Sequence, residues 1–261
     1  MGIIWTGLAP HPPIIVDAVG RSRCREVKTT IQSMNALASD VLARNPRRLV
    51  LVSPHTPRPH QGIAAWSVAE IGGNFSNFGA PGSRLELPVD TQWLERFKLT
   101  YPKVSDMGYE PLDHGAMVPL HFLYEAGWRG ETVVLGLPWN EDIELDRIGQ
   151  AIARASEDDC RTAVLASGDM SHCLLADGPY GFDEHGPQFD NRFVDLVKRA
   201  DYRHVVQIEP QLVSAARQDV VESCRVVWEA TGYRNLNHHF YSYEGPFGVG
   251  YTVMRFFGEE S

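Results

Sequence analysis

Four histidines stand in short motifs whose composition suits metal binding or proton transfer. The motifs are APHPPII at residues 9–15, SPHTP at residues 53–57, DHGAM at residues 113–117 and SGDMSH at residues 167–172, and they carry His11, His55, His114 and His172. A neutral imidazole binds metal ions, and imidazoles also exchange protons near neutral pH. Prolines beside His11 and His55 restrict the backbone, which lowers the entropy lost when a ring is held in one direction. We therefore expect these two histidines to be metal ligands rather than solvated loop side chains.

Two histidine ligands need a third ligand of suitable charge. Two histidines and one carboxylate form the facial triad of non-heme Fe(II) sites, and the same set also suits Zn(II). Asp219 and Glu222 are candidates, because residues three apart are neighbours on one helical face. The Asp-x-x-Glu spacing before an apolar run is also that of a capping box, which would need no metal. Both interpretations stay open for this pair.

The elements that must position these residues are short strands alternating with helices. Apolar runs predict buried strands at residues 3–8, 49–52, 132–137 and 163–166, and helical spacing of apolar residues predicts helices at 27–42, 143–152 and 189–197. A further apolar helix is expected to start at Val118 and Pro119, with Asp113 as a candidate N-cap. This alternation predicts one α/β domain over residues 1–261, with a largely parallel or mixed sheet flanked by helices on both faces.

Three of the histidines follow predicted strands within a few residues. They are His11, His55 and His172. In an open parallel sheet the carboxyl ends of the strands form the edge where ligands bind. We therefore expect these imidazoles to converge, although they are far apart in the sequence.

Two glycine-rich stretches, residues 72–83 and 177–187, are predicted to be irregular loops. Their aromatic side chains could line a ring-sized pocket or pack beneath their own loops. These aromatic residues are Phe75, Phe78, Tyr180 and Phe182. Arg58, just after the His55 motif, could meet a substrate carboxylate or lie on the surface.

Composition argues against several classes of partner. The chain of 261 residues has a formal net charge of -9, and its 24 basic residues are scattered, so no footprint for nucleic acid is expected. The four cysteines include no Cys-x-x-Cys pair, which argues against a zinc knuckle or a disulfide framework and favours a reducing cytoplasm. No segment reaches the roughly 18 consecutive apolar residues of a membrane span. We expect a small-molecule or protein partner.

Seven ordered motifs resemble those of the class III extradiol ring-cleavage dioxygenases of the LigB type. The closest likeness is to the branch related to Memo proteins and found with AMMECR-type domains, and it covers nearly the whole chain. The motifs are APHPPII at 9–15, SPH at 53–55, GNFSNFGAP at 73–81, DHGAMVPL at 113–120, SGDMSH at 167–172, DGPYG at 177–181 and SYEGPFGVGY at 242–251.

The resemblance implies roles for the histidines. His11 and His55 match the two histidine ligands of Fe(II), and His172 matches the histidine that acts as acid and base on the substrate hydroxyl. His114 matches a second active-site histidine that contacts substrate or oxygen. Asp113 is then expected to fix a histidine tautomer from outside the ligand set.

The third ligand matches the family less well. Glu222 takes the place of the family's glutamate when residues are counted back from the expected helix end at Gly232, whereas an ungapped match puts Asp219 near that position. We prefer Glu222, with Asp219 as the alternative.

The function implied is extradiol cleavage of a catechol-like or aminophenol-like ring by Fe(II) and O2. Relatives commonly form dimers, which is compatible with a homodimer here. One alternative is a Memo-like metal-binding or redox and interaction protein without dioxygenase activity, and another is a zinc-dependent hydrolase. The third ligand discriminates between the dioxygenase and the Memo-like protein.

Overall fold

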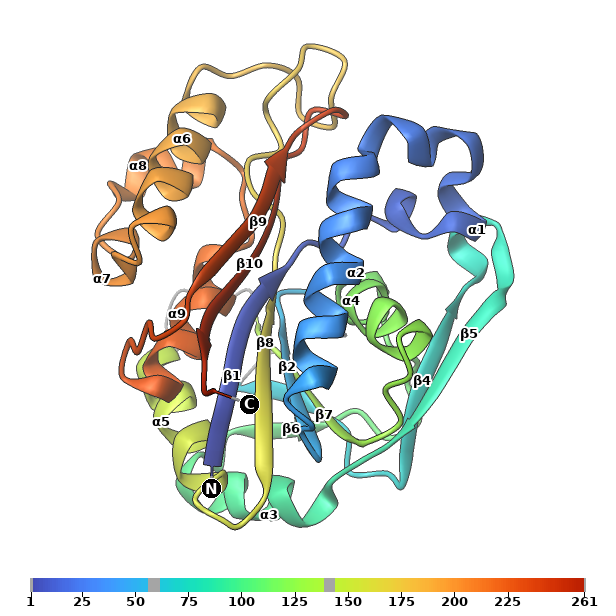
Figure 1. Cartoon of the computed structure of the whole chain (residues 1–261), viewed down its shortest axis with the longest axis vertical. Coiled ribbons are helices and arrows are strands. Elements are labelled where there is room, and N and C mark those ends of the chain that lie inside the picture. The colour runs from blue at the N-terminus through green and yellow to red at the C-terminus, as the bar shows by residue number, and fades with distance from the viewer. Residues whose placement is uncertain (1, 56–61, 139–143, 261) are drawn as a thin grey trace.

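An eight-stranded mixed sheet forms the centre of the molecule (Figure 1). The computed structural model describes residues 2–55, 62–138 and 144–260. In order across the sheet the strands are β6 (Val104–Asp106), β3 (Ile63–Ala65), β7 (Glu131–Gly136), β2 (Arg48–Ser53), β8 (Arg161–Ser167), β1 (Gly2–Ala9), β10 (Tyr251–Gly258) and β9 (His239–Glu244). Strands β7, β2, β8 and β1 run parallel, and β10 and β9 continue antiparallel. The predicted α/β fold and its four strands are confirmed.

Helices cover both faces of this sheet. They are α1 (Asp17–Gly20), α2 (Lys28–Ala43), α3 (Thr91–Thr100), α4 (His114–Glu125), α5 (Leu145–Ala155), α6 (His185–Lys198), α7 (Tyr202–Val205), α8 (Pro210–Ala215) and α9 (Val221–Thr231), with 3-10 turns η1 (Pro13–Ile15), η2 (Arg21–Val27) and η3 (Ser76–Phe78). In the part of the chain that is described, none of these helices combines the length and the apolar character of a membrane span.

Side chains along each strand alternate between the two faces of the sheet, and each face has its own hydrophobic core. On β2, Val50 and Val52 pack with α3, α5, α6 and α9, whereas Leu49 and Leu51 pack with α2 and α4. Successive strand residues point to opposite faces, so a strand covered on both faces must be apolar throughout. This is why the strands appear in the sequence as continuous apolar runs.

Helix α4 starts earlier than the sequence analysis predicted. It begins at His114 instead of Val118, and Pro119 lies inside it. Asp113 is its N-cap and accepts a hydrogen bond from the backbone N–H of Ala116, as expected. The other three predicted helices correspond to α2, α5 and α6, and Ile143 lies outside the described residues.

The first glycine-rich stretch is a hairpin and not the irregular loop expected. Strands β4 (Glu70–Phe75) and β5 (Ala80–Pro88) pair antiparallel on either side of η3. A Cβ at Gly72 would lie 2.2 Å from the carbonyl oxygen of Leu85, so glycine is required for this close approach. Gly79, with φ of +76°, closes the turn. The second stretch is irregular through Glu184, where α6 follows.

Asp190 of α6 ties this helix to the segment that follows β8. Its Oδ1 accepts a hydrogen bond from the backbone N–H of Ser171 (2.9 Å), and its Oδ2 accepts one from the hydroxyl of Tyr243 (2.6 Å). The side chain is buried. Burial raises the pKa of Asp190 to about 6, because it disfavours the carboxylate more than these two hydrogen bonds favour it.

We expect Asp190→Asn to remove a pH-dependent step in stability. The unfolded carboxyl loses its proton near pH 4, whereas the folded one keeps it to about pH 6. The native state therefore binds more protons in this interval, and the wild-type free energy of unfolding falls by up to about 3 kcal/mol as the pH rises. Urea unfolding at a series of pH values should show the difference between variant and wild type shifting by this amount.

Asp195 supplies the matched control, because it lies on the exposed side of the same helix. Asp195→Asn should give a stability curve parallel to that of the wild type. If Asp190→Asn also gives a parallel curve, Asp190 does not hold its proton in the folded state.

Candidate metal centre

Three histidines meet at the carboxyl ends of neighbouring strands. His11 follows β1, His55 follows β2, and His114 opens α4. The ring centroids of His11 and His55 are 4.7 Å apart, and that of His114 lies 5.5 Å and 4.6 Å from them. One ring nitrogen from each lies within 4.8 Å of the others, which could hold a metal ion. The parallel order β2-β8-β1 thus brings His11 and His55 together, more than 40 positions apart, as argued from the sheet edge. The third member of the cluster is His114 of α4 and not His172, which the same argument had included.

Asp219 adds a carboxylate to this cluster. Its Oδ2 lies 2.9 Å from His55 Nε2 and 3.5 Å from His11 Nε2. Ligand atoms at right angles about an ion, each about 2.1 Å from it, are about 3 Å apart. Both distances from the Asp219 oxygen are therefore close to the spacing of adjacent ligands in one coordination sphere. The side chains of His55 and Asp219 are 25% and 20% exposed, so solvent reaches the site.

Glu222, the preferred third ligand in the sequence analysis, lies elsewhere. It sits in the first turn of α9, and its carboxylate accepts a hydrogen bond from the Gln218 side chain (3.3 Å). Burial raises the pKa of Glu222. Among the hydrogen bonds and ion pairs of the described residues, none joins Glu222 to a histidine. The positions of the two carboxylates therefore favour Asp219, the alternative third ligand.

The capping-box interpretation of Asp219 and Glu222 is wrong. The Oε1 atom of Gln218 accepts hydrogen bonds from the backbone N–H groups of Val220 and Val221 at the start of α9. Asp219 therefore lies before the helix, and the expected shared helical face does not exist.

A chain of hydrogen bonds fixes the tautomer of His11. Pro119 has no N–H, so the carbonyl oxygen of Gly115, four residues earlier in α4, lacks its usual helical donor. The Ser167 hydroxyl donates to this oxygen (2.5 Å), and its own oxygen then accepts from His11 Nδ1 (2.9 Å). The Nδ1 atom of His11 carries hydrogen as a result, which directs its Nε2 toward Asp219 and a metal.

Asp169 is a second carboxylate at the site that sequence reasoning missed. Its Oδ1 accepts from the backbone N–H of His11 (2.9 Å), and its Oδ2 lies 3.9 Å from His11 Nε2. Its own N–H donates to Asp219 Oδ1 (2.7 Å). Ser167 and Asp169 both belong to the SGDMSH motif, and their position directly after a predicted strand was the signal available.

The electrostatics of the cluster favour a cation between these groups. Burial alone would lower the pKa of His11, but Asp169 and Asp219 raise it to about 9. Burial would likewise raise the pKa of Asp219, but His11 and His55 hold it below its usual value. Burial and the two neighbouring histidines lower the pKa of His114 to about 3, so this imidazole is neutral. A metal ion would take the place of the proton on His11.

Close packing brings α4 against the ends of the strands. A Cβ at Gly115 would lie 2.7 Å from both His55 Cβ and Ser53 Oγ, so only glycine fits. Asp113 contacts the N-terminus of α4, and among the described residues no hydrogen bond joins it to a histidine. The tautomer-fixing role expected for Asp113 therefore falls to Ser167.

His172 lies beside this cluster without joining it. Its backbone N–H donates to the carbonyl oxygen of Ala216 (3.0 Å), and its buried Nδ1 has no partner among the described residues. Its ring stands edge-on to Tyr180, with centroids 6.0 Å apart. Burial raises the pKa of Asp169, and the nearby imidazoles of His11 and His172 oppose this rise.

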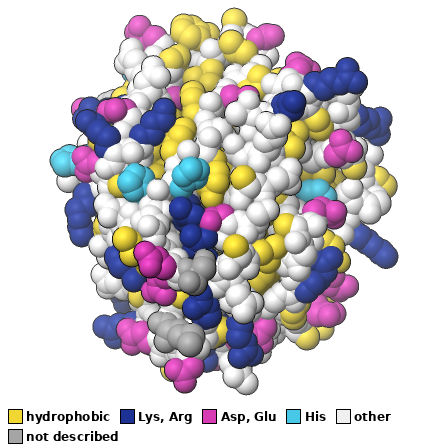
Figure 2. Space-filling model, in the orientation of Figure 1, with side chains coloured by type: hydrophobic (Ala, Val, Ile, Leu, Met, Phe, Trp, Pro, Cys, Tyr) yellow, Lys and Arg dark blue, Asp and Glu magenta, His cyan; other side chains and the backbone are white. Residues whose placement is uncertain are grey.

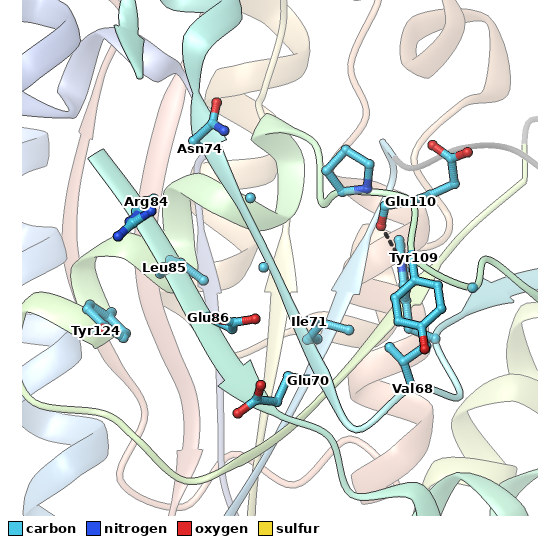
Figure 3. Close-up of a pocket in the computed structure, with 15 residues that line it drawn as sticks. Val68, Glu70, Ile71, Asn74, Arg84, Leu85, Glu86, Tyr109, Glu110 and Tyr124 are labelled. Carbon is cyan, nitrogen blue, oxygen red and sulfur yellow. Dashed lines mark hydrogen bonds between the residues drawn. The ribbon is translucent and has the colours of Figure 1, made fainter. Parts of the chain in front are cut away.

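A separate pocket of about 570 Å³ lies over β4, β5 and the segment before α4 (Figure 3). It carries the carboxylates of Glu70, Glu86 and Glu110, and Trp66 Nε1 donates to the carbonyl oxygen of Glu110 (2.7 Å). None of its described lining residues belongs to the histidine cluster. Arg58 lies outside the described residues.

Comparison with known proteins gives a consistent result. A region of about 260 residues in protein CA_C1420 of Clostridium acetobutylicum is 34% identical and covers 95% of this chain. The match covers 56% of the relative, so this chain spans little more than half of the relative's length. The crystal structure of the uncharacterized protein JW3007 from Escherichia coli K12 superposes with a TM-score of 0.59 at 15% identity, over 97% of this chain and 98% of that one, which shows a shared fold.

The family comparison is more specific. Residues 6–254 match the model described as the catalytic LigB subunit of aromatic ring-opening dioxygenase. This span includes the whole histidine cluster and Asp219. The chain therefore belongs to the LigB family.

Proposed function

We propose that this protein is an Fe(II)-dependent dioxygenase that cleaves a catechol-like or aminophenol-like ring beside its hydroxyl groups. The observation that carries this proposal is the position of Asp219 Oδ2, 2.9 Å and 3.5 Å from the Nε2 atoms of two histidines. Two imidazoles and one carboxylate leave a bound metal with other positions free. His11, His55 and Asp219 would hold the ion.

Fe(II) at these residues would supply a Lewis acid for both substrate oxygens and a position for dioxygen. The protein's own contribution is to orient and to move protons. Ser167 holds the His11 ring in one tautomer, and Asp169 holds the His11 backbone. His114, which is neutral, can donate a hydrogen bond to substrate or oxygen or add a fourth nitrogen to the site.

His172 is the group we assign to proton transfer. Imidazole is the side chain best suited to take a phenol proton and return it near neutral pH. The backbone bond from His172 to Ala216 connects it to the segment that carries Asp219. The substrate's second hydroxyl would lose its proton to His172 and the ring-opened product would receive it.

The Memo-like alternative predicts that no carboxylate faces the two histidines. Asp219 argues against this alternative. Zinc hydrolysis uses the same kind of ligand set, so metal content and oxygen use must separate it from dioxygenase chemistry. The chain spans 56% of its relative's length, so the activity of the whole protein is also part of this proposal.

We expect Asp219→Asn to weaken Fe(II) binding by more than about 100-fold, because loss of an outer partner alone already costs about 10- to 100-fold. Anaerobic calorimetric titration of the metal-free protein with Fe(II) measures this affinity. Glu222→Gln is the matched control, and we expect its affinity to stay within about threefold of the wild type. The reverse outcome, with Glu222→Gln losing the metal, would make Glu222 the third ligand.

The Fe(II)-loaded protein should consume one O2 per ring with some catechol or aminophenol and form a yellow ring-opened product. An oxygen electrode and absorption spectra measure the two quantities together. We expect His172→Gln to lower turnover by about 100- to 10,000-fold, the usual contribution of acid–base catalysis, while metal binding is kept. Iron-loaded protein that turns over no member of a broad panel would contradict the proposed function.

A further inference from the structure

A hollow of about 710 Å³ lies between η2 and the first half of α2 on one side and the second half of α4 on the other. Residues of η1, α1 and β5 complete its walls. None of its described lining residues belongs to the histidine cluster. Sites for small molecules commonly have volumes of about 300–1,000 Å³, so this hollow is large enough for such a ligand.

Helical spacing brings three cationic side chains to one wall of the hollow. Arg21 and Cys24 are three residues apart on η2, and residues at this spacing are aligned in a 3-10 helix. Lys28 and Ile31 are three apart on α2, where this spacing also makes neighbours. Arg25 lies between these pairs, in the last turn of η2, and lines the same hollow.

The side chains of these three cations make no hydrogen bond and no ion pair with any described residue, and all three are exposed. Arg23 of the same 3-10 helix differs from them. It donates to Glu26 (3.3 Å) and stacks on the Phe247 ring at 4.6 Å, and it does not line the hollow. Unpaired arginine and lysine side chains that share one wall are suited to bind an anion.

The other titratable groups of the hollow leave an excess of positive charge. Asp17 and Glu125 also line it, so three cations face two carboxylates. Burial lowers the pKa of His121, which makes its imidazole neutral near pH 7. Burial and the nearby Asp17 raise the pKa of the Cys24 thiol, which stays protonated. The whole chain has a net charge of -9, so this positive excess is local.

Apolar side chains form the floor beneath the cations. Ile15 and Phe122 line the hollow and are buried in the core that α2 and α4 share, and Ile31 packs against this core. Asn35 and Ser83 add neutral hydrogen-bonding groups to the walls. An occupant would therefore meet positive charge along one wall and apolar surface below it.

The pictures agree with this distribution of charge. In Figure 2, Lys and Arg side chains gather at the upper right of the face shown, where Figure 1 shows the turns that join α1 to α2. The pocket in Figure 3 has the opposite character, because three glutamates line it with a single cation, Arg84. The two hollows therefore suit ligands of opposite charge.

We propose that the hollow between η2, α2 and α4 binds a phosphate ester of about the size of a nucleotide. Its phosphate groups would meet Arg21, Arg25 and Lys28, and its apolar or aromatic part would lie on Ile15 and Phe122. Three cations exceed what a single carboxylate can use, whereas a diphosphate offers more than one negative charge and several acceptor oxygens. The inference does not depend on the ring-cleavage reaction.

The test uses ADP as the probe, with pyrophosphate and adenosine as its two parts. Calorimetric titration of the full chain at low ionic strength measures each affinity. We expect ADP to bind more tightly than pyrophosphate and adenosine, because only ADP meets both the cations and the apolar floor. Added salt should weaken ADP binding, because the cations are exposed and their attraction is screened.

Variants of η2 locate the site. We expect Arg25→Gln to weaken ADP binding about 10-fold, since one charge-assisted hydrogen bond is lost. Arg25→Lys keeps the charge and should restore part of the affinity. Arg23→Gln is the matched control, because Arg23 lies on the same 3-10 helix but outside the hollow, and its ADP affinity should stay within about threefold of the wild type.

Asp219→Asn separates this hollow from the histidine cluster and should leave ADP affinity within about threefold of the wild type. The inference is overturned if the wild type binds neither ADP nor pyrophosphate, or if adenosine binds as tightly as ADP. Equal losses in Arg23→Gln and Arg25→Gln would show diffuse attraction to a basic surface, and loss in Asp219→Asn alone would place the anion at the histidine cluster. Both results would also overturn it, and the proposed function would survive each of them.

Discussion

The hydrogen bond from Ser167 to Gly115 is the contact on which the geometry of the histidine cluster depends. It exists because Pro119 removes the helical donor that would otherwise satisfy the carbonyl oxygen of Gly115. The bond joins the end of β8 to the start of α4, and the same hydroxyl oxygen orients the His11 ring after β1. A proline that looks unfavourable for a helix thus supplies the acceptor that connects three elements at one point.

Close backbone contacts also position the carboxylate of Asp219. Gly168 lies against the backbone of Val220, since a Cβ there would stand 2.5 Å from its Cα. Asp169 and Asp219 then bond reciprocally: the N–H of Asp169 donates to the Asp219 side chain, and the N–H of Asp219 donates to the carbonyl oxygen of Asp169 (3.2 Å). Asp219 is therefore held by the segment after β8, and α9 only begins beyond it.

The fold was predictable from the sequence, whereas the third ligand candidate at the histidine cluster was predictable only in part. Strand positions and the convergence of His11 and His55 follow from apolar runs and from the geometry of parallel sheets, so both were predictable. The start of α4 and the location of Asp219 depend on contacts between segments about 50 residues apart, which helical periodicity does not contain. Spacing alone made Glu222 look equivalent to Asp219, and only the tertiary contacts distinguish them.

The segment of residues 216–219 links the histidine cluster to its surroundings. Residues 216–219 contact, in order, His172 through a backbone carbonyl, Tyr180 through Arg217, the start of α9 through Gln218 and the two histidines through Asp219. This short irregular stretch keeps its position because hydrogen bonds join it to the segment after β8 at one end and to the start of α9 at the other. The carboxylate of Asp219 and the backbone of His172 are thereby held in fixed positions relative to each other, as a site that places several groups around one ligand requires.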